Sequence, residues 1–142
     1  MIVNSHADSM AQAVAEENPH AMARCTKTVV EATRQLIVSQ QWQDIEELAT
    51  SVDAVLAAAR EKGYLPTPEM TLVADLAQQA FAVLQFVAHT RGERHNGNFI
   101  AARRQADRLD KMTDGQLDLA SLVELVPESD KTDDPNIRFS LG

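Results

Sequence analysis

Apolar residues recur at steps of three and four along most of the chain, which is the spacing of one face of an α-helix. Regular apolar seams of this kind occupy residues 22–36, 45–59 and 99–109. A fourth stretch, Glu69–Thr90, is apolar at most of its positions. Breaks that are polar or rich in glycine and proline separate these stretches, at 39–43, 63–68 and 92–98. The pattern predicts four main helices joined by short loops.

Glu69–Thr90 is the stretch around which the rest of the chain is expected to pack. Its polar and small residues form one narrow helical stripe, made of Thr71, Asp75, Gln78, Ala82, Gln85 and His89. A surface helix normally shows the reverse, a narrow apolar stripe on a polar body. We therefore expect other helices to cover most of this one, with the polar stripe facing solvent. Asp75 and the glutamines interrupt the apolar run, so no membrane span is expected.

The two ends of the chain differ from this central part. Residues 5–18 predict a short first helix, anchored by Met10 and Val14, and residues 117–126 predict a short last one. The final residues 127–142 are polar and acidic, which is typical of an arm outside the core. The fold expected is all-α: an antiparallel bundle of four main helices plus short terminal helices. Residues 1–126 form its single domain and 127–142 an extended acidic C-terminal arm.

Cysteine content and the N-terminal sequence bear on the compartment. The single cysteine, Cys25, excludes a disulfide within the chain and lies in an apolar seam, where a small buried hydrophobe is expected. The first ten residues lack a basic region followed by an apolar run, so we expect no signal peptide. Together these features favour a cytoplasmic protein.

Charge is unevenly distributed along the chain. The formal net charge is −8, yet residues 91–111 carry six basic and three acidic residues, so this segment is +3 and the remainder −11. Arginine forks bind phosphate groups, so one hypothesis is a nucleic-acid or phosphate-binding helical module. The other interpretation is a solvated helix face. The residues concerned are Arg91, Arg94, Arg103, Arg104 and Arg108.

No motif of catalysis or metal binding is present in the sequence. It contains no glycine-rich phosphate loop, GxSxG, HExxH or cysteine pair. His89 and His95 are six residues apart across a glycine, which is not a ligand spacing on one helix. We therefore expect no enzymatic activity, no cofactor and no metal.

One stretch carries a resemblance to a known class. A tryptophan shortly after a polar break (LIVSQQWQDIEELA), followed by a long amphipathic helix, is similar to the small helical export chaperones of flagellar and type III systems. The resemblance covers roughly Met22–Ala59. It implies a helical protein that works by binding another protein.

The function expected is that of a non-enzymatic protein-binding module: an adaptor, small chaperone or inhibitor of a bacterial or phage protein partner. A possible homodimer is also expected, because apolar residues lie on nearly all sides of Glu69–Thr90. The negative net charge makes nucleic acid a less favoured partner. Partner contact is predicted at the apolar last helix and at the end of the arm, where apolar and polar residues alternate. The alternative is that these residues simply cap the core of the bundle. They are Leu119, Leu122, Val123, Leu125, Ile137, Phe139 and Leu141.

Overall fold

The structure, a computed structural model, describes residues 2–127, with side chains from Ser5 onward. Within these residues it contains six α-helices and no strand, so the all-α prediction is confirmed. The predicted arm lies almost wholly outside the described residues. The helices are α1 (Ile2–Ala15), α2 (Pro19–Val38), α3 (Trp42–Glu61), α4 (Pro68–His89), α5 (Gly97–Met112) and α6 (Leu119–Glu124).

Local sequence accounts for most helix boundaries. The Asn18 side chain accepts a hydrogen bond from the backbone N–H of Ala21 at 3.0 Å, with Pro19 in the first turn of α2. Thr67 caps α4 in the same way, through the N–H of Met70 at 3.1 Å. α5 begins at Gly97 with Asn96 as its cap, whose side chain accepts a hydrogen bond from the backbone N–H of Asn98 at 2.8 Å.

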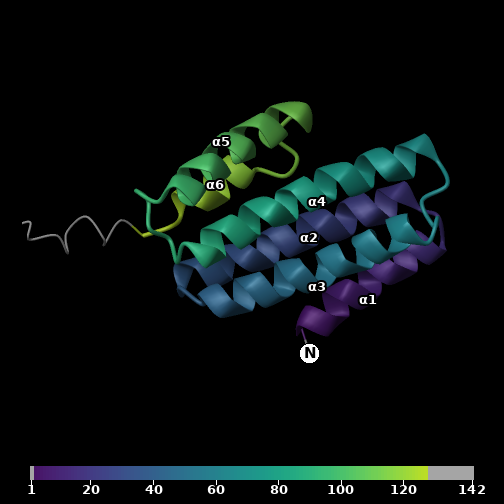
Figure 1. The fold of residues 1–142 in the computed structure, drawn as a ribbon, viewed down its shortest axis with the longest axis horizontal. Helices are drawn as coiled ribbons and strands as arrows, with labels where there is room; N and C mark the ends of the chain where they lie inside the picture. Colours follow the sequence, from purple (N-terminus) through teal and green to yellow (C-terminus); the bar gives the residue numbers. More distant parts are fainter. Residues whose placement is uncertain (1, 128–142) are drawn as a thin grey trace, which may run out of the picture.

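The first four helices lie side by side along the long dimension of the molecule (Figure 1). The chain reverses direction from α2 to α3 and again to α4, across connections 39–41 and 62–67. α4 contacts α2, α3 and α5, while α1 packs on α2 and α3. α5 and α6 pack on each other and cover one side of α4 and α2. α4 is therefore the central element, as its composition predicted.

Other helices cover most of α4, as expected, but two of its large apolar side chains remain exposed. Phe81 and Leu84 are fully buried in the core, but Leu72 remains 56% exposed and Phe86 39% exposed. The physical reason is that α3 and α5 pack on two different sides of α4 and leave a strip between them.

α4 also has the length and apolar composition of a membrane-crossing helix, and it alone does so among the described helices. Of the 18-residue stretch of α4 that has this composition, 44% is buried inside the protein. A core helix of a bundle meets the same criterion. The expected lack of a membrane span therefore stays a prediction.

The turn after α4 joins three distant parts of the chain. Gly92 has a φ of +77°, in the left-handed region that favours glycine. A Cβ placed there would lie 2.8 Å from Val126 Cγ1 and 3.0 Å from ring carbons of Trp42. The missing side chain thus lets the end of α6 and the start of α3 meet at this turn.

Candidate functional site

The apolar segment predicted to contact a partner is mostly part of the core. Leu119 and Leu122 are fully buried and Val123 is 1% exposed, whereas Leu125 is 37% exposed. Leu119, Leu122 and Val123 therefore belong to the core of the described fold, and partner contact through them stays a prediction. Ile137, Phe139 and Leu141 lie outside the described residues.

The N-terminal end of α6 is held by a side chain from α5. The two carboxylate oxygens of Asp110 accept hydrogen bonds from the backbone N–H groups of Leu119 and Ala120, at 2.8 and 2.9 Å. Asp118, at the position expected to cap, has a φ of +56° and makes no such bond. Asp110 therefore satisfies the first N–H groups of α6 and places a negative charge at its positive end.

The C-terminal end of α6 is held by Arg94. Its Nη2 donates to the carbonyl oxygen of Val126 at 2.6 Å and to that of Glu124 at 3.3 Å. The guanidinium lies 5.7 Å from the ring centroid of Phe99, and the side chain is 11% exposed. A cation at this end complements the helix dipole. Asp110 and Arg94 together fix α6 against α5, so α6 is a structural element.

Of the other arginines of the basic segment, Arg103 shares an acidic partner with Arg94, because Arg94 also lies 3.9 Å from the Glu124 carboxylate. Arg103 forms an ion pair with Glu124 at 3.0 Å, and Arg108 donates to the Gln79 side chain at 2.7 Å. Arg91 and Arg104 are exposed, on the turn after α4 and on α5. The phosphate-binding alternative stays a prediction, but Arg94 is already bonded to the backbone of α6.

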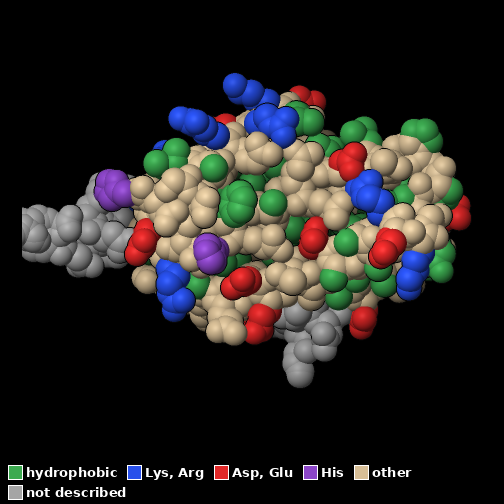
Figure 2. Space-filling view, viewed as in Figure 1, with side chains coloured by type: hydrophobic (Ala, Val, Ile, Leu, Met, Phe, Trp, Pro, Cys, Tyr) green, Lys and Arg blue, Asp and Glu red, His purple; other side chains and the backbone are tan. Residues whose placement is uncertain are grey.

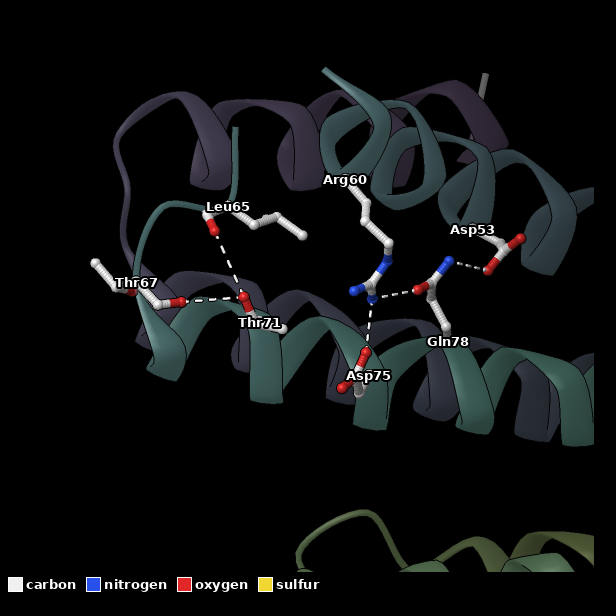
Figure 3. A network of polar contacts seen from close by, with 7 residues as sticks. All are labelled: Asp53, Arg60, Leu65, Thr67, Thr71, Asp75 and Gln78. Carbon is white, nitrogen blue, oxygen red and sulfur yellow. Dashed lines mark hydrogen bonds and ion pairs between the residues drawn. The ribbon is translucent and has the colours of Figure 1, made fainter. Parts of the chain in front are cut away.

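The polar stripe of α4 faces α3. Arg60 Nη2 binds both Asp75 Oδ1 and Gln78 Oε1 at 2.7 Å, and the Gln78 amide donates to Asp53 at 3.2 Å (Figure 3). Further along, Gln85 donates to Thr50 at 3.2 Å. The stripe expected to face solvent thus forms a polar seam between two helices. Arg60 and Asp75 are both more than 40% exposed, so this ion pair adds little stability.

The exposed strip of α4 lies between that seam and α5. Within the strip, Gln79 accepts hydrogen bonds from Arg108 and from Gln105 of α5. Leu72, Gln79 and Phe86 follow one another at seven-residue spacing and therefore share one face of the helix. Sequence reasoning missed this stripe, although the spacing was visible, because the neighbouring stripe contains more polar residues.

The two helices that flank the strip carry opposite charge. Arg104, Arg108 and Lys111 repeat at steps of four and three on α5, all exposed. On α3, Glu46, Asp53 and Glu61 share the face that borders α4. Figure 2 shows Lys and Arg side chains gathered over α5 and Asp and Glu side chains along α3. We name this surface the central face: an apolar strip of Leu72 and Phe86, a basic edge of Arg104, Arg108 and Lys111, and an acidic edge of Glu46, Asp53 and Glu61.

Two grooves open elsewhere on the described surface. One, of about 330 Å³, lies between α2, α4 and the end of α5, and the other, of about 630 Å³, between α1, α3 and the connection after α3. Both are mainly apolar. The charged residues of the first are Lys27 and Asp114, and those of the second Glu17 and Lys62. Neither lining contains a histidine or cysteine that a catalytic site would use.

The described titratable residues do not assemble into a metal centre, since no three histidine, cysteine or acidic side chains come together. Cys25 is 7% exposed, as predicted for a small buried hydrophobe, and its thiol donates to the carbonyl oxygen of His6 at 3.5 Å. Burial raises the pKa of the Cys25 thiol, which keeps it protonated and unreactive at neutral pH.

Comparison with known proteins found no matching family model, no matching curated protein and no matching solved structure. The function is therefore inferred from the side chains that this chain exposes. Of the described surfaces, the central face combines exposed large apolar residues with segregated charge.

Proposed function

We propose that the protein is a non-enzymatic protein-binding module of the adaptor, small-chaperone or inhibitor type, and that its partner binds the central face. The observation that carries the proposal is the exposure of Leu72 and Phe86 on the helix that forms the core. Apolar side chains bordered by polar residues are typical of protein–protein interfaces. The strip therefore supports binding of another protein surface.

Charge on the two edges defines the partner further. A bound protein would place acidic groups over Arg104, Arg108 and Lys111, and basic groups over Glu46 and Glu61. Its centre would carry apolar side chains that cover Phe86. Complementary charge at the edges would set the orientation and raise the association rate, while the apolar strip would supply most of the affinity.

The size of the face suits a specific complex. α4 has 22 residues, which at 1.5 Å per residue corresponds to a length of about 33 Å. Three helices packed roughly 9 Å apart span on the order of 25 Å, giving about 800 Å². Standard interfaces bury about 800 Å² on each partner.

The proposal is tested by capture of partners from native lysate with tagged wild-type protein and two matched variants. Phe86→Asp places a charge in the apolar strip. Val38→Asp makes a similar change at an apolar residue that is 57% exposed on α2, outside the face. We expect a stoichiometric protein to be retained by the wild type and by Val38→Asp, and lost from Phe86→Asp. Equal retention by the wild type and both variants would contradict a role for the central face.

The nucleic-acid or phosphate alternative has one observation in its favour, the cations gathered over α5 (Figure 2). A nuclease arm in the same capture distinguishes it. Material that disappears on nuclease treatment, and that Arg104→Glu also abolishes, would favour phosphate binding by the basic edge. Such binding would weaken steeply with salt.

A further inference from the structure

We propose that the partner of the central face is a second copy of this chain, bound about a two-fold axis that runs along the strip of α4; this inference rests on the function proposed above. α3 and α5 lie on opposite sides of the strip, as their separate hydrogen bonds to Gln78 and Gln79 establish. A two-fold axis that lies in the plane of the contact and runs parallel to α4 places the second copy face to face with the first and exchanges those sides. Each copy therefore lays its α5 over the α3 of the other.

This exchange brings unlike charges together twice. The basic edge, Arg104, Arg108 and Lys111, meets Glu46, Asp53 and Glu61 of the second copy, and the reverse contact follows by symmetry. The basic edge spans about 10 Å along its helix and the acidic edge about 22 Å, at 1.5 Å per residue. Asp53 bonds to Gln78 and Arg108 to Gln79, so these two side chains lie at neighbouring heights along α4, and the axis brings Arg108 of each copy to Asp53 of the other.

The remaining cation on this side of α3 does not oppose the arrangement. Arg60 is already paired with Asp75 of its own chain, at 2.7 Å. Because this ion pair is neutral overall, Glu46, Asp53 and Glu61 still give the acidic edge a negative charge. A second copy thus satisfies both edges, whereas an unrelated protein would have to carry both charge patterns independently.

Apolar residues at the centre complete the match. The two-fold axis brings α4 of one copy against α4 of the other. Because the axis runs parallel to α4, Leu72 and Phe86 of one copy lie at the same heights as Leu72 and Phe86 of the other. Phe86 of each copy is then covered, which removes the exposed apolar surface of the core helix from water.

Charge-reversal variants test this pairing. The basic-edge variant carries Arg104→Glu and Lys111→Glu, and the acidic-edge variant carries Glu46→Lys and Glu61→Lys; all four side chains are exposed. Sedimentation measures the mass of each full chain and of their equimolar mixture, at about 100 μM, a concentration suited to weak dimers. Circular dichroism verifies that each variant is folded.

We expect the wild type to have twice the 15.6 kDa mass of one chain, and each variant alone to have the mass of one chain. The mixture should regain the doubled mass, because each edge of one variant then faces an edge of unlike charge on the other variant. A wild-type chain of single mass overturns the inference, as does a dimer that neither variant weakens. A mixture that stays at single mass also overturns it.

Failure of this inference is distinguishable from failure of the proposed function. A monomeric wild type whose lysate partner is lost on Phe86→Asp overturns the second copy and leaves the central face as a protein-binding surface. A monomeric wild type whose retained proteins are unchanged by Phe86→Asp overturns both. Association that is abolished by Val38→Asp and not by Phe86→Asp would place the contact on α2.

Discussion

Replacement of Arg94 by alanine should destabilise the fold more than replacement of any exposed arginine of α5. The guanidinium is 11% exposed and donates to the Val126 carbonyl at 2.6 Å, at the end of α6. A hydrogen bond to a charged group contributes about 1.5–3 kcal/mol, and the contact with Phe99 adds about 0.5–1 kcal/mol. The longer contacts with exposed Glu124 add little. We expect a loss of about 2–4 kcal/mol in the free energy of unfolding.

Urea unfolding followed by circular dichroism measures this loss. Arg104→Ala is the matched control, because it removes the same kind of side chain from an exposed position on α5, and its effect should stay within about 0.5 kcal/mol. Arg94→Lys should lie between the wild type and Arg94→Ala, since lysine keeps the charge but lacks the fork. Equal losses for Arg94→Ala and Arg104→Ala would refute the structural role of Arg94 at α6.

Three further predictions concern single residues. Gly92→Ala should lower the free energy of unfolding by about 2–4 kcal/mol, because the left-handed φ and the 2.8 Å approach to Val126 both disfavour a Cβ. Gly115 also has a left-handed φ, of +76°, but open space around it, so Gly115→Ala should cost only about 1 kcal/mol in the same urea unfolding assay. Asp110→Ala should cost about 1–2 kcal/mol through loss of the α6 cap, and Asp110→Asn should cost less because one acceptor oxygen remains; equal losses in urea unfolding would contradict capping. Since burial raises the pKa of the Cys25 thiol, stability should fall as pH rises above the ordinary cysteine value of about 8.5; Cys25→Ala should lack this component of the pH profile, and an unchanged profile would show that the thiol does not titrate in this way.

Local signals in the sequence located the main helices well. The threonine–proline pair at 67 and 68 fixes the start of α4, and Gly63, with a φ of +78°, follows the end of α3. These features depend on neighbouring residues only, and so the sequence is enough to predict them.

The role of α6 was beyond local reasoning. An apolar segment of ten residues predicts a buried face but does not say whether the same chain or a partner covers it. The residues that decide the question are distant in sequence: Asp110 holds the start of α6 from α5, and Arg94 holds its end from the turn before α5. Their carboxylate and guanidinium groups make the segment part of the domain.

The exposed strip of the central face could not be predicted either, because the sequence does not show on which side of α4 the helix α3 packs. Two stripes on α4, one through Gln78 and Gln85 and one through Leu72 and Phe86, both follow helical spacing. Composition favours the first as the solvent-facing side. Because α3 supplies Thr50 and Asp53 as partners for the glutamines, the polar stripe is used between helices and the apolar stripe is left exposed.

The most direct measurement is the mass of the wild-type chain in solution beside Phe86→Asp and Val38→Asp, by sedimentation at about 100 μM. If the central face binds a second copy, the wild type and Val38→Asp should sediment at twice 15.6 kDa and Phe86→Asp at 15.6 kDa. A wild type at 15.6 kDa, or a Phe86→Asp variant at the doubled mass, would contradict self-association through α4.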